Sequence, residues 1–219
     1  MKLISATPSP WARKIRILAI EKDIDLEIVN DVPWAPETCV PDYNPLEKLP
    51  ILVTDDGDAI YESRLIVEWL ERRFPTPAMI PEDDAGYILA KKFEVLADCT
   101  LDAMLLNVFE TARDRVDAQW EIRQRRKVVG GVREIARLIG DRAFAIGERL
   151  TLADAAVGSL LGSLAFSATQ SRTVPEGDWR SRYPALGRYF DKLEQRPSFI
   201  ETRPIMFNFD FTKQATRSA

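Results

Sequence analysis

The chain has 219 residues, of which 46% are hydrophobic and 29% are charged, and this usage is typical of a folded globular protein. The net charge of −4 argues against a protein whose main work is to neutralise phosphates, so we expect no nucleic-acid partner. The sequence contains no histidine. This excludes Ser-His-Asp and Cys-His nucleophiles, HExxH zinc sites and His-ligated haem.

The two cysteines, Cys39 and Cys99, lie sixty residues apart without a CxxC motif. One chain can therefore build neither a cysteine zinc cluster nor a dithiol redox site, and we expect no metal. Both thiols are expected to be buried or half-buried, which suits a reducing cytoplasm. The N-terminal apolar run is too short for a signal peptide, and the longest apolar stretch, residues 153–168, is too short for a membrane span. We expect a cytoplasmic protein with no membrane partner.

Up to about Arg73, strand patterns alternate with helix patterns. Runs rich in β-branched and aliphatic residues predict strands at residues 2–5, 25–30, 51–54 and 59–61. Apolar residues at helical spacing predict helices at residues 11–22 and 63–73. The Asp-rich cluster at residues 55–58 has the length of a hairpin turn, so the third and fourth strands should be antiparallel neighbours. The predicted order is βαβ, a connecting segment, then ββα.

The second half of the chain has helical spacing throughout. Three prolines between Phe74 and Pro81 cannot continue a helix or a central strand, and they predict a linker at residues 75–82. A long amphipathic helix is predicted from the spacing of Ile88, Phe93, Leu96, Leu101, Leu105 and Val108. A helix with a solvated basic face is predicted at residues 118–139, and Gly130 and Gly131 weaken its middle. Another helix is predicted at residues 183–196 and stops at Pro197.

A helix-capping pattern stands at residues 151–154. The Thr151 hydroxyl can accept a hydrogen bond from the third helical N–H, and the Asp154 carboxylate can reach back to the N–H of Thr151. The residues that follow are too apolar to lie outside a core. The pair is therefore expected to begin a buried helix.

Three local motifs make the arrangement specific. They are Ser9-Pro10-Trp11-Ala12-Arg13-Lys14 before the first helix, Asn44-Pro45-Leu46-Glu47-Lys48-Leu49-Pro50-Ile51-Leu52 before the hairpin, and Glu62-Ser63 after it. This ordered set resembles the cytosolic glutathione S-transferase superfamily, in its bacterial, serine-type form, and residues 151–154 and 196–199 extend the resemblance over essentially the whole chain. It implies a fold of the α/β plus all-α class: a thioredoxin-like βαβ-ββα domain at residues 1–74 and an all-helical domain at residues 83–219.

The resemblance implies glutathione as co-substrate and Ser9 as the catalytic residue. A thiol with a pKa of about 8.5 is mostly protonated at neutral pH, so an enzyme must stabilise the thiolate. Ser9, at the N-terminus of the first helix, would do so through the helix dipole and a charge-assisted hydrogen bond. Cysteine, which other family members have at this position, would instead imply a mixed disulfide with glutathione. The alternative is that Ser9 is only an N-cap before Pro10.

The same resemblance implies the glutathione-binding residues. The backbone of Leu49, ahead of a cis-Pro50, would pair with the cysteinyl backbone of glutathione as an added strand does. Glu62 would face the γ-glutamyl ammonium, and Ser63 with the start of its helix would receive the carboxylate. Ser63 could equally be an N-cap, whereas Glu62 has no comparable structural role.

Other family features are less clearly matched. Lys48 and Arg13 are candidates for binding the glycyl carboxylate. In a homodimer, Asp98 or Asp102 could bind the γ-glutamyl amine in the partner subunit, although a solvated helix face is the simpler interpretation. A pocket for a small hydrophobic electrophile, expected between the domains, would use Trp11, Met104, Phe109, Trp120, Phe207 and Phe209. An aromatic stripe is more often part of a core.

These features favour a dimeric cytoplasmic glutathione transferase that moves alkyl or aryl groups in detoxification. The chemistry needs only positioning and one hydrogen bond to an anion, which agrees with the histidine-free sequence. Alternatives on the same site are glutathione-dependent dehalogenation, isomerisation and ether cleavage, although the Ser-Ser-Cys-Ser signature of the isomerase class is missing. A non-catalytic binding or regulatory protein is a further alternative, because fold does not fix function.

Overall fold

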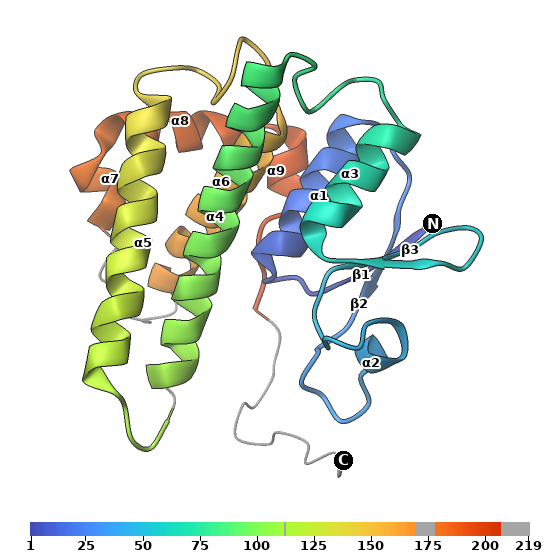
Figure 1. Ribbon diagram of the computed structural model, residues 1–219, viewed down its shortest axis with the longest axis horizontal. Helices are drawn as coiled ribbons and strands as arrows, with labels where there is room; N and C mark the ends of the chain where they lie inside the picture. Colours follow the sequence, from blue (N-terminus) through green and yellow to red (C-terminus); the bar gives the residue numbers. More distant parts are fainter. Residues whose placement is uncertain (112, 170–177, 207–219) are drawn as a thin grey trace. The chain divides into compact units, whose positions relative to one another are not determined.

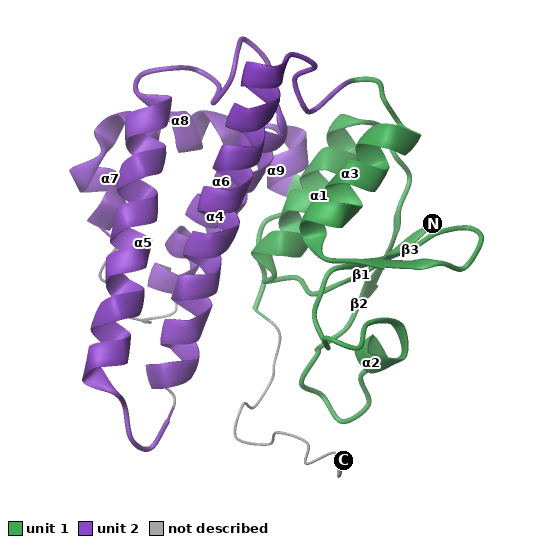
Figure 2. Ribbon diagram, in the orientation of Figure 1, with its two compact units in different colours: residues 1–77, 201–219 green, residues 78–200 purple. Residues whose placement is uncertain are grey.

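The computed structural model describes residues 1–111, 113–169 and 178–206. The chain forms two compact units, shown in Figure 2. The first unit contains residues 1–77 and the described residues from Glu201 onward, and the second contains residues 78–200. The first is α/β and the second is helical, which confirms the predicted fold class. The boundary at Pro77 falls within the predicted linker, but no sequence pattern indicated that the C-terminal segment groups with the first unit.

The first unit is built on a four-stranded mixed sheet with the order β2-β1-β3-β4 (Figure 1). The strands are β1 (Lys2–Ser5), β2 (Glu27–Asn30), β3 (Ile51–Val53) and β4 (Ala59–Tyr61). β1 pairs parallel with β2 and antiparallel with β3, and β3 pairs antiparallel with β4. The predicted hairpin is therefore confirmed, and every strand lies within two residues of its expected position.

Helices cover both faces of this sheet (Figure 1). The helices are α1 (Pro10–Glu21), α2 (Val40–Tyr43) and α3 (Ser63–Arg73). Ile4, Ile51 and Val53 form a buried cluster with Val40 of α2. α1 and α3 lie side by side on the other face, toward which the alternating pattern of the strands directs Leu3. The sequence did not predict α2, because four residues are too few to show a helical period.

The second unit consists of helices in its described part. They are α4 (Asp84–Thr111), α5 (Ala118–Ile139), α6 (Leu152–Thr169), α7 (Trp179–Arg182), α8 (Pro184–Leu193) and α9 (Pro197–Glu201), the last of which crosses into the first unit. α5 has the predicted bounds, and the short α7 was not predicted. Pro197 opens α9 as its first residue, a position that tolerates proline because its N–H has no intrahelical partner. Among the described helices, none is long and apolar enough to cross a membrane.

Two glycines allow the helices of this unit to approach closely. A Cβ atom on Gly131 of α5 would lie 1.9 Å from Oγ1 of Thr100 on α4. A Cβ atom on Gly158 of α6 would lie 2.3 Å from the Phe199 ring of α9. Both distances are far inside van der Waals contact. Gly131 lowers the helix propensity of α5, but packing against α4 requires a residue without a side chain at this position.

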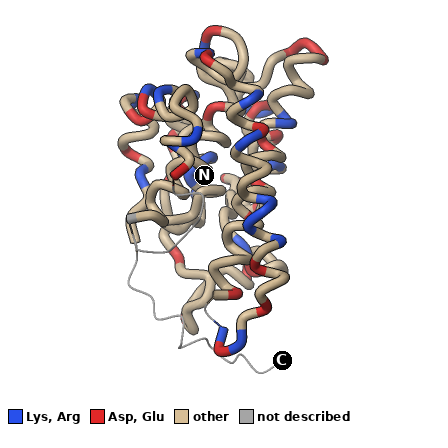
Figure 3. The backbone as a smooth tube through the Cα atoms, turned by 90° about the vertical axis from the view of Figure 1, so that its left-hand side faces the viewer, with Lys and Arg blue, Asp and Glu red and all other residues tan. Residues whose placement is uncertain are grey.

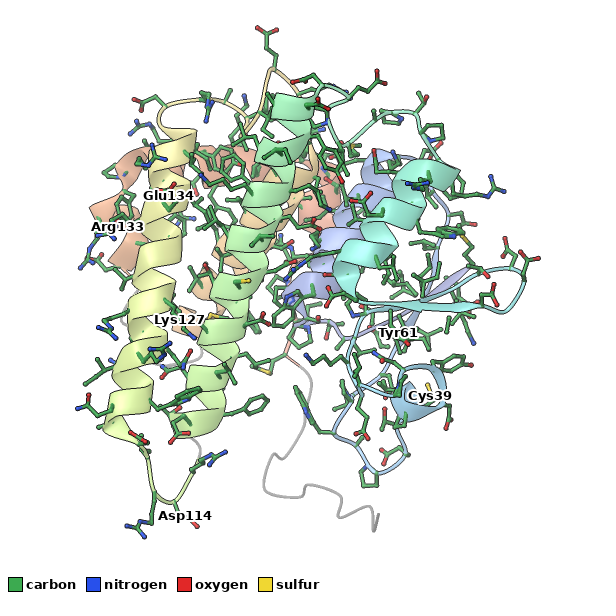
Figure 4. All side chains as sticks on the ribbon, viewed as in Figure 1. Cys39, Tyr61, Asp114, Lys127, Arg133 and Glu134 are labelled. Carbon is green, nitrogen blue, oxygen red and sulfur yellow. The ribbon has the colours of Figure 1, made fainter. Side chains whose placement is uncertain are left out.

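The exposed faces of α4 and α5 only partly follow expectation. On α5 the basic residues are solvated as predicted, and Figure 4 labels Lys127 and Arg133 among them. Figure 3 shows Lys and Arg interspersed with Asp and Glu along the chain. The expectation for Cys99 was wrong, because this thiol lies on the exposed side of α4. The solvated interpretation of Asp98 was also wrong, since its side chain is 2% exposed, whereas Asp102 is exposed.

The start of α6 is held by a buried carboxylate. Asp154 accepts hydrogen bonds from the N–H of Ala145 (2.7 Å), the N–H of Thr151 (2.8 Å), the Thr151 hydroxyl (2.9 Å) and the Tyr189 hydroxyl of α8 (2.8 Å). The predicted reach of Asp154 back to Thr151 is thus confirmed. The N–H of the third helical residue, Asp154, donates to the backbone carbonyl of Thr151 at 3.1 Å, while the Thr151 hydroxyl donates to the Asp154 carboxylate. Burial raises the pKa of the Asp154 carboxyl, and the four hydrogen bonds oppose that rise.

This network predicts that Asp154→Ala destabilises the helical unit strongly. Four buried donors would lose their acceptor together, which should lower the free energy of unfolding by about 3 kcal/mol or more. Tyr189→Phe removes one donor and leaves the others paired, so it should cost about 1 kcal/mol. Chemical denaturation of both variants measures the difference. Equal midpoints for Asp154→Ala and the wild type would show that the carboxylate does not hold the unit together.

Candidate functional site

The strand register brings three loops of the first unit to one edge of the sheet. Ile4, near the end of β1, pairs with Ile51 at the start of β3, and Ile51 pairs with Tyr61 at the end of β4. The segment that leaves β1, the segment that enters β3 and the segment that leaves β4 therefore begin side by side. These segments carry Ser9, Leu49-Pro50 and Glu62-Ser63 respectively, so the fold brings together the residues singled out in the sequence.

Ser9 is the N-cap of α1. Its backbone is extended, with φ −70° and ψ 116°, and its hydroxyl accepts a hydrogen bond from the N–H of Ala12 at 3.3 Å. A serine hydroxyl has one donor and two acceptor positions. Accepting from Ala12 therefore leaves the O–H able to donate to an anion. Capping α1 and stabilising a thiolate are compatible roles for this side chain.

The approach to β3 is fixed by Asn44, a residue of the sequence motif to which the sequence analysis gave no role of its own. The peptide bond between Leu49 and Pro50 is cis, as predicted. The buried side chain of Asn44 donates to the carbonyl of Lys48 at 2.8 Å and accepts from the N–H of Leu46 at 2.9 Å. Asn44 thus shapes the loop that presents the Leu49 backbone. The Asn44-Pro45 dipeptide, a common turn former, was the available signal.

The N-cap of α3 is Glu62, although the sequence suggested Ser63 for this role. Glu62 is the N-cap of α3, and its carboxylate accepts from the N–H of Arg64 at 3.3 Å and from the Ser63 hydroxyl at 3.4 Å. Ser63 is the first helical residue and is 2% exposed. The expectation that Glu62 lacks a structural role was therefore wrong. Its φ of 71° lies in the left-handed region, and such strain in a non-glycine residue is common at ligand sites.

The electrostatics of this edge suit a small ligand with charges of both signs. The N-termini of α1 and α3 both open onto it, and each carries a positive partial charge with backbone N–H groups directed outward. These ends favour a thiolate or a carboxylate. The exposed Glu62 carboxylate beside them favours an ammonium.

The two candidates for a carboxylate-binding cation lie in different environments. The Lys48 side chain is exposed on the loop that enters β3. Arg13 is 2% exposed, and its Nε donates to the Thr202 hydroxyl at 3.4 Å. Lys48 is therefore the more accessible of the two candidates.

Cys39 lies in the same unit but is not an activated thiol. Its N–H and its thiol both contact Oδ2 of Asp31, at 3.0 and 3.1 Å. Burial and the neighbouring Asp31 raise the pKa of Cys39, which lowers the thiolate fraction at neutral pH. Within the described residues, no group of three or more cysteine and acidic side chains could hold a metal ion.

The predicted electrophile-binding residues differ in their exposure to solvent. Met104 of α4 is buried, Trp120 of α5 is exposed, and Trp11 and Phe109 are half-buried. Phe207 and Phe209 lie outside the described residues.

Comparisons with known proteins show the family of the chain. Residues 8–73 match the family model of the glutathione S-transferase N-terminal domain, and residues 66–192 match that of the C-terminal domain. A crystal structure of a glutathione S-transferase from Methylobacterium radiotolerans, in complex with glutathione sulfonate, is similar with a TM-score of 0.89. It is 47% identical in sequence, and the match covers 95% of this chain and 97% of the other.

Two curated relatives extend the comparison. The GST-like protein YibF of Escherichia coli is 34% identical over 206 residues, covering 93% of this chain and 98% of the relative. Maleylacetoacetate isomerase of Pseudomonas aeruginosa is 27% identical over 220 residues, covering 93% and 96%. With both domain models matched in order along the chain, the chain belongs to the glutathione S-transferase family.

Proposed function

We propose that this protein is a glutathione transferase that activates the glutathione thiol for attack on a small hydrophobic electrophile. The observation that carries the proposal is the convergence of Ser9, the Leu49-Pro50 segment and Glu62-Ser63 at one edge of the sheet. The similar structure from Methylobacterium radiotolerans, which was crystallised with glutathione sulfonate, supports it.

Glutathione would be held through its polar ends. The Leu49 backbone would pair with the cysteinyl backbone, Glu62 would face the γ-glutamyl ammonium, and the N-terminus of α3 with Ser63 would receive the γ-glutamyl carboxylate. Lys48, the accessible cation on the same loop, would bind the glycyl carboxylate. The thiol would then lie toward Ser9 at the start of α1.

Catalysis would follow from ionisation of that thiol. The S–H proton leaves to solvent, and the Ser9 O–H donates to the sulfur anion. A hydrogen bond to a charged group is worth about 1.5–3 kcal/mol, which lowers the thiol pKa by about one to two units. The thiolate then attacks an electrophilic carbon, so that a C–S bond forms while the bond to the leaving group breaks and its electron pair departs with that group.

The remaining elements of the proposal concern the second unit and the assembly. The second unit would contribute to the electrophile pocket, and two chains would form a cytoplasmic homodimer. Exposed apolar side chains on α3 and α4, Leu65, Ile88 and Val95, support such an assembly. Asp102, exposed on α4, would be the acidic residue able to reach the γ-glutamyl amine in the partner subunit, because Asp98 is buried.

Glutathione-dependent isomerisation is the second candidate function. The similarity to maleylacetoacetate isomerase favours it, whereas the missing Ser-Ser-Cys-Ser signature argues against it. Dehalogenation and ether cleavage would use the same thiolate.

Retention on immobilised glutathione, followed by assays with a generic aryl halide and a cis-configured dicarbonyl acid, separates conjugation from isomerisation. Retention without turnover of any substrate class would favour a non-catalytic binding protein.

We predict that Glu62→Ala and Ser63→Ala each weaken glutathione binding by about tenfold or more, because each leaves one charged end of the ligand unpaired. Glu62→Gln is the matched control, since its side-chain oxygen can still cap α3 while its charge is lost. Isothermal titration calorimetry measures the three affinities. If Glu62→Gln binds as weakly as Glu62→Ala, recognition of the ammonium by charge is supported, whereas wild-type affinity in all three variants would remove this site assignment.

We predict that Ser9→Ala raises the pKa of bound glutathione by about one to two units and leaves glutathione affinity nearly unchanged. Ser9→Asp separates catalysis from capping. Asp is as good an N-cap as Ser, so it should retain stability, while its negative charge disfavours the thiolate. Thiolate absorbance titrated against pH measures the pKa. Wild-type titration of bound thiol in Ser9→Ala would mean that Ser9 is a helix cap and no more.

A further inference from the structure

Residues 6–9 form a turn that ends at Ser9 and is hydrogen-bonded to other parts of the first unit. The turn is closed by the N–H of Ser9, which donates to the carbonyl of Ala6 at 3.0 Å. Thr7, at the corner of the turn, presents a hydroxyl and a carbonyl, and both are hydrogen-bonded to distant parts of the chain. Since Ser9 follows two residues later, these contacts constrain where its hydroxyl lies.

The partners of Thr7 lie on the C-terminal segment and on α1. The Thr7 hydroxyl donates to the carbonyl of Ile205 at 2.8 Å, across 198 residues of sequence. The Nη2 atom of Arg16 lies 3.4 Å from the carbonyl of Thr7 and 3.5 Å from that of Thr202. One guanidinium therefore bridges the turn and the C-terminal segment.

A further contact anchors the same segment on α1. The buried Arg13 donates to the hydroxyl of Thr202, whose side chain is 2% exposed. Figure 2 shows that residues 202–206, the described residues beyond α9, group with the first unit. We call residues 202–205 the C-terminal clamp.

The positive charge of Arg16 on α1 explains why this helix binds backbone carbonyls of both segments. Burial and the neighbouring Arg13 lower the pKa of Arg16 to about 10, so Arg16 remains a cation at neutral pH. A largely buried cation needs polar partners, because leaving water is costly. The carbonyls of Thr7 and Thr202 provide such partners from two segments. The contact therefore stabilises Arg16 and holds both segments at the same time.

We propose that the C-terminal clamp positions the turn of residues 6–9, with Thr7 and Arg16 as positioning residues for Ser9. This inference rests on the proposed function of Ser9. A donor must be held within about 0.5 Å of its productive geometry to stabilise an anion well. Glu62 and Ser63 lie on α3, outside the turn. Loosening the clamp should therefore impair thiol ionisation rather than glutathione affinity.

The test uses full-length point variants. Thr7→Val removes the hydroxyl at nearly constant volume, and Thr7→Ser retains it. Arg16→Lys keeps the charge but shortens the side chain, so that no nitrogen reaches the position of Nη2, the atom that contacts both carbonyls. Thr111→Val is the matched control, because the Thr111 hydroxyl also donates to a backbone carbonyl, that of Val108 at 3.0 Å, but lies on α4. For each variant we would measure amide hydrogen exchange, the pKa of bound glutathione and glutathione affinity.

Hydrogen exchange tests the clamp without glutathione. In Thr7→Val and Arg16→Lys, the amides of Ala6, Thr7, Ser9, Trp11 and Ala12 should exchange about fivefold faster, the effect of losing one ordinary hydrogen bond. Thr7→Ser and Thr111→Val should exchange like the wild type in that segment. Unchanged exchange in both Thr7→Val and Arg16→Lys would overturn the clamp, whether or not the protein binds glutathione.

The thiol titration tests positioning. Thr7→Val and Arg16→Lys should raise the pKa of bound glutathione by about half a unit, less than the one to two units predicted for Ser9→Ala, with affinity within about twofold of wild type. Faster exchange with an unchanged thiol pKa, in a protein where Ser9→Ala does raise it, would overturn the positioning role. A thiol pKa unaffected by Ser9→Ala would instead count against the proposed function of Ser9, and with it against the positioning role.

Discussion

The candidate site depends on one constraint, the pairing of β1 with β3 and of β3 with β4. Because Ile4, Ile51 and Tyr61 lie in one row across the sheet, three loops from distant parts of the sequence begin at the same edge. A slip of one residue would turn every strand side chain to the other face. The buried cluster around Ile4, Ile51 and Val53 therefore fixes both the core and the site.

The site needs few ionisable groups, because backbone geometry supplies much of its electrostatics. The N-termini of α1 and α3 open toward a common edge of the sheet. Their N-caps, Ser9 and Glu62, therefore lie at that edge as well. Each side chain serves its helix and remains available to a ligand. Under the proposed function, this double use would let a protein without histidine bind and ionise a thiol, since one hydrogen bond and a helix dipole favour the anion.

The helical unit follows a different principle, in which close packing and the buried carboxylate of Asp154 set the arrangement. Gly131 and Gly158 allow α4, α5, α6 and α9 to approach within distances that no side chain would permit. Asp154 joins the start of α6 to Tyr189 of α8. A buried acceptor with four donors tolerates little change, because each donor would be left unpaired.

The sequence by itself determined the order of the elements and the fold class, because strand and helix periods and the capping and turn residues are local signals. The residues of the candidate site were indicated by the resemblance of three motifs to a known family. It missed α2 and α7, which are too short to show a period, and it misjudged the exposure of Cys99 and Asp98, which depends on what packs around α4. Only the tertiary structure decided that Glu62 caps α3 and that Thr7 contacts Ile205. The contact of Thr7 with Ile205 joins residues 198 positions apart, and no pattern along the chain encodes it. The cap of α3 is a local contact, from the N–H of Arg64 to Glu62, but the sequence did not distinguish Glu62 from Ser63 as the capping residue.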